Sequence, residues 1–228
     1  MPIGSLRMKR DVLAELYPPL GLTVTADGLT LRLLRDSDLP AYADLISARL
    51  FADEDAPYVF AWWDRDPMLR QRESLQFVWS QRARIGPEEW KLQFGVFEDD
   101  RLIGFQDLDA TSFAKLRVVS SGSYLRLDAQ GRGIGTLMRQ MILVLAFDHL
   151  GALRAESSAA VDNKASLAVS GHCGYRLDGV QVAMNGERRI ELQRVAVTPD
   201  TFIRPRAEVR VTGLTFELRR QLAVGDQR

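Results

Sequence analysis

Residues 121–145 read SGSYLRLDAQGRGIGTLMRQMILVL, and this stretch decides the fold. It contains an extended segment, a glycine-rich turn at residues 130–135 and then a helix. Glycine lacks a Cβ, so the turn can adopt positive φ and let a ligand approach the backbone. The first amides of a helix have no intrahelical acceptor, and the positive end of the helix dipole favours phosphate. We therefore predict an anion site at residues 130–136.

Two common phosphate motifs do not fit the turn. A dinucleotide fingerprint, counted from Gly131, requires glycine where the chain has Thr136. A P-loop requires a lysine after its last glycine, and none follows Gly135. The pattern that fits is [Q/R]-x-x-G-x-[G/A], beginning at Gln130. The alternative is a tight strand-to-helix turn that binds no ligand.

Composition narrows the class of protein. The chain has 228 residues, 46% of them hydrophobic, which suits one domain with an extension. Its net charge of +0 gives no general footprint for nucleic acid or a membrane surface. A single cysteine, Cys173, excludes an intrachain disulfide and predicts a cytoplasmic location. We expect neither a transmembrane helix nor a signal peptide.

Periodicity and turn residues predict an α/β (α+β) order of elements. A short helix at 11–17 comes first. The predicted strands are 29–33, 90–96, 102–109, 115–127, 153–158, 175–179 and 189–197. The predicted longer helices end near 49, span 67–84, follow the glycine turn up to 151, and span 163–173. Residues 51–66 are predicted to form an acidic, aromatic loop, and a strand, turn and helix are predicted after residue 199.

A second motif lies downstream of the turn: N-x-x-S from Asn163 to Ser166, then Gly174-Tyr175, then Gly179. The two motifs and the order of elements carry a resemblance to a known family. On these features, residues 29–197 resemble the RimJ/RimL-like branch of the GNAT superfamily of acyl-CoA-dependent N-acyltransferases. The resemblance implies a mixed, mostly antiparallel sheet of six to seven strands flanked by about four helices.

The same resemblance implies three parts: an N-terminal extension at 1–27, an acyltransferase domain at 28–198, and a C-terminal extension at 199–228. The last would pack on the domain or on an oligomer partner. The extensions look similar to those of actinobacterial members, some of which are assigned as succinyltransferases.

The implied reaction is direct attack of an amine on the thioester of acetyl-CoA or succinyl-CoA, without a metal. The pantetheine arm would bind to Leu125, Arg126 and Leu127, and to Asn163 and Ser166. The pyrophosphate would bind to the amides of Gln130, Gly131, Arg132, Gly133, Ile134, Gly135 and Thr136. The side chain of Arg132 would add charge or remain a solvated turn residue.

The resemblance specifies the catalytic groups less closely than it specifies the CoA-binding residues. A backbone N–H near Tyr124 would polarise the thioester carbonyl. Many members place a tyrosine where this chain has Ser170, so Ser166 is the predicted acid, with helix capping as its alternative role. Glu156 is a predicted base. Asp107 and Asp109 are alternatives for the base, and all three carboxylates are equally consistent with surface strand ends.

The loop at 51–66 is predicted to border the acceptor. Phe60, Trp62 and Trp63 would contact a cationic amine, together with Asp107. In the alternative interpretation the tryptophans plug the core. His149 and His172 lack neighbouring ligands, so no metal site is expected.

Two classes of function follow. The first is an N-acyltransferase acting on a small-molecule or peptide amine. The second is a non-catalytic acyl-CoA-binding sensor or interaction module. The acceptor stays open among a protein N-terminus, lysine, a polyamine and an antibiotic amine. A homodimer or higher homo-oligomer, driven by the tail from residue 199, is also open.

Overall fold

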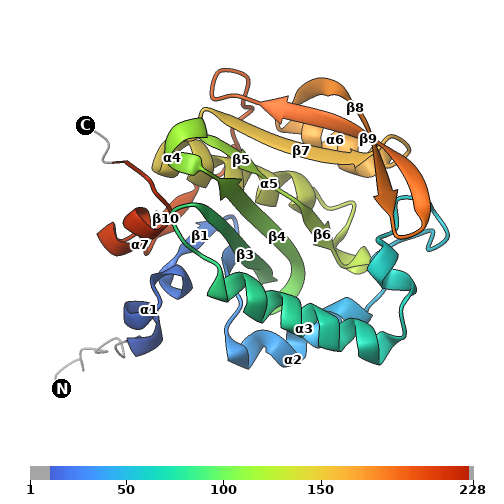
Figure 1. The fold of residues 1–228 in the computed structure, drawn as a ribbon, viewed down its shortest axis with the longest axis horizontal. Helices are drawn as coiled ribbons and strands as arrows, with labels where there is room; N and C mark the ends of the chain where they lie inside the picture. The colour runs from blue at the N-terminus through green and yellow to red at the C-terminus, as the bar shows by residue number, and fades with distance from the viewer. Residues whose placement is uncertain (1–10, 226–228) are drawn as a thin grey trace.

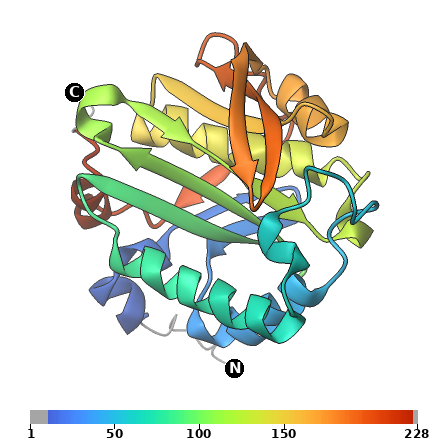
Figure 2. The same ribbon diagram turned by 45° about the vertical axis from the view of Figure 1, so that its right-hand side comes forward.

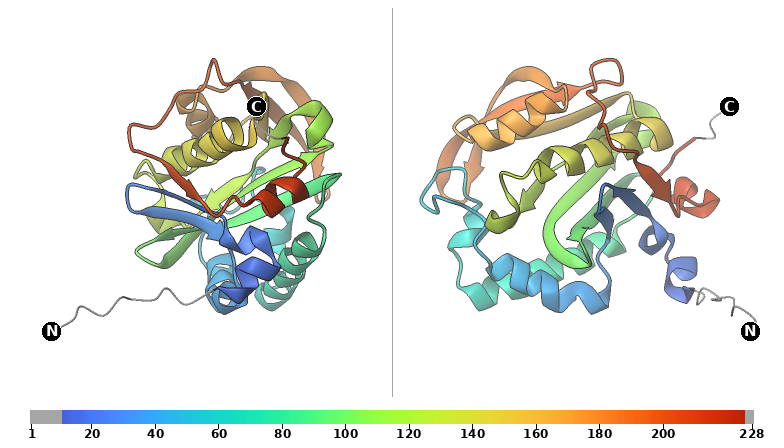
Figure 3. Two further views of the ribbon diagram at one scale, coloured as in Figure 1. Left: turned by 90° about the vertical axis from the view of Figure 1, so that its left-hand side faces the viewer. Right: turned by 180° about the vertical axis from the view of Figure 1, so that it is seen from behind.

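The computed structural model describes residues 11–225 (Figure 1). Within this range one sheet of ten strands has the order β10-β1-β2-β3-β4-β5-β7-β9-β8, and β6 pairs with β4 alone. In the described residues β5 and β7 are the one parallel pair. Helices α2 and α3 cover one face of the sheet, and α5 and α6 cover the other (Figures 1 and 3).

The helices are α1 Val12–Leu16, α2 Leu39–Ser47, α3 Pro67–Ala83, α4 Phe113–Leu116, α5 Ile134–Val144, α6 Lys164–His172 and α7 Phe216–Gln221. The strands are β1 Thr23–Ala26, β2 Leu29–Leu33, β3 Glu89–Glu98, β4 Arg101–Thr111, β5 Val118–Ser120, β6 Ser123–Leu125, β7 Arg154–Ala160, β8 Arg176–Asn185, β9 Arg188–Val197 and β10 Arg210–Thr212. A π-helical turn, Leu145–Leu150, extends α5. It ends at Gly151, whose φ is 73°.

The α/β (α+β) class and the mostly antiparallel sheet are confirmed, but the expected six to seven strands are too few. One reason is that β1 and β10 come from the two predicted extensions and pair with each other at the sheet edge. Another is that the predicted strand 115–127 is wrong. It divides into β5 and β6 after α4, which occupies the start of that range. The predicted strand 175–179 is too short, since β8 continues to Asn185.

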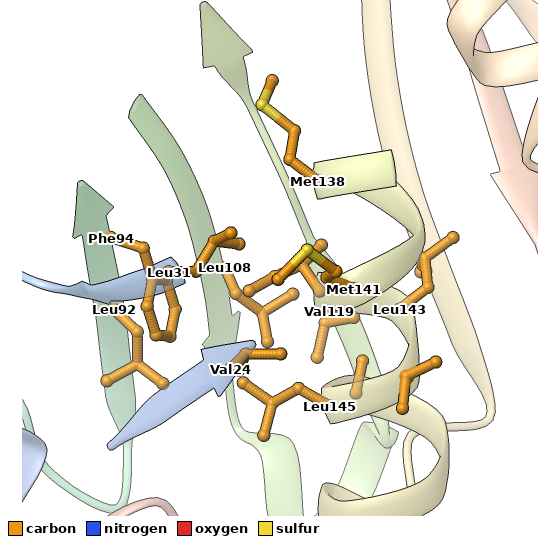
Figure 4. Close-up of a cluster of buried hydrophobic side chains, with 14 of the residues drawn as sticks. Val24, Leu31, Leu92, Phe94, Leu108, Val119, Met138, Met141, Leu143 and Leu145 are labelled. Carbon is orange, nitrogen blue, oxygen red and sulfur yellow. The ribbon is translucent and has the colours of Figure 1, made fainter. Parts of the chain in front are cut away.

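Two apolar clusters fill the two sides of the sheet. The larger joins β1 to β5 with α5, and Figure 4 shows their side chains pointing toward one another. Its members include Leu31, Leu92, Phe94, Leu108, Val119 and Met141. The smaller joins α2, α3 and the aromatic loop to β3 and β4. Because α5 is covered on all sides, even Arg139 and Gln140 are buried.

The C-terminal segment is fastened to the sheet by a buried hydrogen bond. Trp90 Nε1 donates to the Leu222 carbonyl oxygen over 3.0 Å. Leu222 is fully buried at 0% exposure, so its carbonyl has no route to water. The described residues past 199, up to 225, therefore belong to the same packed unit as β3.

Trp90→Phe is expected to lower the free energy of unfolding by about 1–2 kcal/mol, because a buried carbonyl loses its donor. Chemical denaturation at constant m-value would measure this. Phe113→Leu is the packing control, because it alters the ring that packs edge-on against Trp90 but leaves the Trp90–Leu222 hydrogen bond in place. Unchanged stability in Trp90→Phe would contradict the tethering role.

Candidate functional site

The central feature of the site is the divergence of β6 from β7. The parallel pairing of β5 with β7 ends at Ser120 and Glu156. One more bond follows, from the Ser121 N–H to the Glu156 carbonyl oxygen over 3.1 Å. Beyond it β6 stays on β4 while β7 stays on β9. Two strand edges therefore face each other across an unpaired gap. Figure 1 labels β6 and β7 where they diverge, and in Figure 2 the β8–β9 hairpin lies in front of this region.

The edge of β6 that faces this gap has free amides. The Gly122 carbonyl accepts from Asp107, and the Arg126 N–H donates to Ile103, so even-numbered positions bond to β4. Alternation then directs the backbone groups of Ser123 and Leu125 toward the gap. The backbone N–H of Tyr124 faces β4, so it is the neighbouring amides that are available.

Of the three consecutive residues 125–127, which were predicted to bind the pantetheine arm, only one has its N–H on this edge. The Leu125 amide faces the gap, while the amides of Arg126 and Leu127 donate to the carbonyls of Ile103 and Arg49. On the opposite strand, alternation from the bonded Glu156 carbonyl directs Ser158 and the Ala160 amide toward the gap.

The glycine turn adopts the geometry that an anion site needs. Gly131 and Gly133 have φ of 72° and 81°, and a Cβ added at either would meet nothing within 4 Å. Gly133 is the N-cap of α5. Within residues 11–225, the amides of Gly131, Arg132, Gly133, Ile134 and Gly135 have no acceptor. Free N–H groups and the helix dipole thus coincide at the end of β6.

Side chains of the turn hold it in place. Gln130 Nε2 donates to the carbonyls of Leu50 and Leu125 over 2.8 Å and 3.0 Å. Arg132 forms a bidentate pair with Glu98 at 2.6 Å and 3.0 Å. The Gln130 side chain therefore braces the turn. The charge of Arg132, at the edge of the turn, is already paired with Glu98.

The second motif caps a helix. Asn163 is the N-cap of α6, and its Oδ1 accepts from the Ser166 N–H over 3.1 Å. Ser170 is 3% exposed and its hydroxyl donates to the Ser166 carbonyl over 3.1 Å. Among the described residues the Ser166 hydroxyl has no hydrogen-bond partner. Of these two serines, Ser166 is the one free to contact a ligand.

An aromatic layer lies on the α2/α3 side of the gap. Tyr124 stacks on Phe105 with ring centroids 5.4 Å apart, and its hydroxyl lies 3.4 Å from that of Tyr42. Burial raises the pKa of Tyr124 well above 10.0, so its phenol stays protonated at neutral pH. Phe60 stacks on Trp62 at 5.3 Å, and Trp62 lies 6.3 Å from Tyr124.

Trp63 differs from Phe60 and Trp62. It is 9% exposed, and the Arg70 guanidinium lies 4.0 Å from its ring centroid. The chain itself therefore supplies the cation over this ring, and Trp63 fills the core of the α2/α3 side. Phe60 and Trp62 remain half-buried and accessible.

The acidic residues of the loop are largely engaged. Asp66 caps α3 by accepting from Met68 and Leu69. Asp64 pairs with Arg188 at 3.5 Å. Asn185, at the tip of the β8–β9 hairpin, also bonds this loop: its Oδ1 accepts from Ala61 over 2.8 Å. The hairpin tip and the aromatic loop thus close against each other on the acceptor side.

Two predicted carboxylates stand on either side of the point of divergence. Asp107 accepts from the Gly122 N–H and pairs with Lys91 at 3.0 Å. Burial raises the pKa of Asp107 above 3.8, and the pairing with Lys91 opposes this only in part. Glu156 accepts from Arg154 over 2.6 Å. Asp109 also pairs with Lys91, at 2.7 Å.

Sequence reasoning missed two parts of this site. Arg139 lies beneath the gap and contacts serines on both strands. Asn185 joins the hairpin to the aromatic loop. No motif marks either residue; a signal for Arg139 was a charged position inside a helix with apolar residues on several faces. In residues 11–225 there is no group of three or more His, Cys, Asp or Glu suited to a metal, and no helix long and apolar enough to cross a membrane.

Residues 28–176 match the family model described as the acetyltransferase (GNAT) domain, which covers well over half of the chain. The chain therefore belongs to the GNAT acetyltransferase family, and it is an enzyme of the N-acetyltransferase class. The resemblance drawn from the two motifs is confirmed at this level.

Solved structures share the fold at low identity. RimJ of Mycobacterium smegmatis in complex with CoA-disulfide is 19% identical, with a TM-score of 0.64 over 80% of this chain and 90% of that chain. Spermidine N-acetyltransferase of Vibrio cholerae, in complex with CoA and spermine, is 19% identical, with a TM-score of 0.59 over 76% and 97%. RimL, a ribosomal L7/L12 alpha-N-protein acetyltransferase, is 16% identical, with a TM-score of 0.62 over 77% and 94%.

Proposed function

We propose that the protein transfers an acetyl or succinyl group from CoA to a primary amine, by direct attack of the amine in a ternary complex. The observation that carries this proposal is the gap between β6 and β7. At one end of this gap lie the unpaired amides of residues 131–135, at the start of α5. Family membership supports the same reading.

The donor would bind mainly to the backbone. The pantetheine arm would lie in the gap as an added strand between the edges at Ser123 and Ser158. The pyrophosphate would accept from the amides of residues 131–135, where the helix dipole adds to the attraction. The N–H of Ser123 or Leu125 would donate to the thioester carbonyl. A donor of this kind lowers the barrier by about 3 kcal/mol.

The amine must be neutral when it attacks. A lysine with a pKa near 10.4 loses roughly 4.6 kcal/mol to deprotonation at pH 7, whereas an α-amine near 7.8 loses about 1 kcal/mol. We propose Glu156 as the base, since it lies on the strand that borders the gap. Both carboxylate oxygens of Asp107 already have partners in the protein, so we propose a positioning role for Asp107 instead of proton transfer. It would fix where β5 ends and β6 begins.

The leaving thiolate must gain a proton. We propose the free hydroxyl of Ser166, at the first turn of α6, as that acid. On the acceptor side, Phe60 and Trp62 offer accessible rings to the amine or to the chain that carries it. The substrates of the similar structures range from a polyamine to a protein N-terminus, so the acceptor class here would be a small-molecule or peptide amine.

The test combines binding with turnover. Calorimetric titration with acetyl-CoA, succinyl-CoA and free CoA is expected to give saturable binding. A panel of an N-terminal peptide, a lysine peptide, spermidine and an aminoglycoside would then be screened for release of free CoA thiol. Binding without turnover of any amine would favour the non-catalytic sensor. Absence of binding by all three CoA species would overturn the CoA site itself.

A further inference from the structure

A buried polar cluster lies on the α5 side of the sheet, beneath the point where β6 leaves β7. Arg139 of α5 donates to the Ser123 hydroxyl over 3.0 Å and to the Ser157 hydroxyl over 3.4 Å. These serines belong to the two diverging strands, so the guanidinium spans the closed end of the gap. The full cluster is Gln106, Ser121, Ser123, Arg139, Ser157 and Tyr175.

Arg139 has no counter-ion. It is 3% exposed, and among residues 11–225 no carboxylate forms an ion pair with it. A buried charge without a partner is costly, since it has lost its hydration. Four buried atoms of the cluster have no partner with ordinary hydrogen-bond geometry in the described residues: Gln106 Oε1, Ser121 Oγ, Arg139 Nε and Tyr175 OH. The polar groups that interact with the Tyr175 hydroxyl are the side chains of Ser121 and Arg139 themselves, which belong to the same cluster.

In the proposed complex the acyl group would lie next to this cluster. In the proposed complex the thioester carbonyl accepts from the N–H of Ser123 or Leu125, so the acyl chain extends past Ser123. The Ser123 side chain faces α5 and touches Arg139. An acetyl group ends in a methyl, which can neither pair with the guanidinium nor satisfy the free hydroxyls.

We propose that Arg139 is a donor-specificity residue that binds the distal carboxylate of a dicarboxylic acyl-CoA of the succinyl class. This inference rests on the proposed function and names its donor. The guanidinium can present two N–H groups to one carboxylate, and the Ser121 and Tyr175 hydroxyls supply further donors. The carboxylate thereby becomes the counter-ion that residues 11–225 do not supply to Arg139.

The experiment uses donors that separate charge from size. Succinyl-CoA and butyryl-CoA have acyl chains of equal length, but only the first carries a carboxylate. Calorimetric titration of the full chain with both, with acetyl-CoA and with free CoA is expected to show succinyl-CoA binding about 10- to 100-fold tighter than butyryl-CoA, the range of a charge-assisted hydrogen bond.

Arg139→Gln is expected to abolish this preference while changing the dissociation constants of acetyl-CoA and free CoA less than about 3-fold. Arg139→Lys, which keeps the charge, should retain part of the preference, and Arg210→Gln, on the exposed edge of the sheet, should retain all of it. Thermal melting would confirm that each variant is folded.

Equal binding of succinyl-CoA and butyryl-CoA by the wild-type protein would overturn the inference without any variant. So would an equal loss for all donors in Arg139→Gln, which would assign Arg139 to the scaffold. Both results leave the CoA site intact, whereas no binding of any CoA species overturns the proposed function instead.

Discussion

Gly133→Asp is expected to weaken binding of CoA by about 100-fold or more, a free-energy change of about 2.7 kcal/mol. Gly133 has a φ of 81° and open space around the position of a Cβ, so the variant can fold. The carboxylate of the introduced aspartate would lie at the N-cap of α5, next to the unpaired amides that we propose to bind the pyrophosphate.

The size of this effect follows from charge. Two like unit charges about 4 Å apart repel by about 4 kcal/mol at an effective dielectric of 20, and by about 1 kcal/mol in bulk water. The introduced side chain also accepts hydrogen bonds from the amides that would hold the phosphates. Because mobile ions screen the repulsion, the loss should shrink as salt is raised from low concentration to about 1 M.

Gly28→Asp is the matched control. Gly28 has a φ of 79°, and a Cβ added there would meet nothing within 4 Å, but it lies in the β1–β2 turn. Both variants place aspartate in the left-handed region, at a cost in stability of about 1 kcal/mol each. Calorimetry should therefore show that both variants fold, with Gly133→Asp no less stable than Gly28→Asp because its side chain caps α5, and that only Gly133→Asp loses CoA binding. Equal CoA affinities would mean that the turn binds no phosphate.

Local chemistry explains what the sequence predicted well. The freedom of glycine to take positive φ, seen at Gly131 and Gly133, can be inferred from residue type and spacing alone. The same holds for Asn163, a cap residue before a helical segment. Helices α3 and α5 were predicted because their caps and apolar spacing are local signals.

The break that opens the gap could not be predicted locally. Ser121 and Gly122 interrupt what reads as one strand, and the interruption is set by distant partners. The Asp107 carboxylate on β4 accepts from the Gly122 N–H, while the Glu156 carbonyl on β7 accepts from the Ser121 N–H. Arg139 was missed for the same reason: its role depends on Ser123 and Ser157, which come from two strands distant from α5 in the sequence and meet the buried guanidinium only in the fold.

Asp107→Ala is expected to lower kcat/KM by about 100-fold, with most of the loss in kcat. The Asp107 carboxylate accepts from the Gly122 N–H and thereby fixes where β6 turns away from β7. The next amides along β6 are those proposed to polarise the thioester, and a displaced donor loses most of its contribution of about 3 kcal/mol. Thiol-release kinetics with the best amine from the panel would measure the change.

Asp107→Asn separates positioning from proton transfer. The asparagine Oδ1 can still accept from Gly122, so a positioning role predicts kcat within about 5-fold of wild type and an unchanged pH profile of kcat/KM. If Asn is as inactive as Ala, and the acidic limb of the profile disappears, Asp107 is the base instead of Glu156.

The pH dependence of stability gives an independent check on the same carboxyl group. Its pKa is raised above 3.8 in the folded state by burial, so its proton stabilises the fold. That contribution is fully present below pH 3.8 and is lost as pH rises through the raised folded pKa. Asp107→Asn cannot lose a proton, so its stability relative to wild type should improve over that rise. If the relative stability of Asp107→Asn falls over that pH rise, the ion pair with Lys91 outweighs burial. Asp107 would then fix the point where β6 leaves β7 in its charged form.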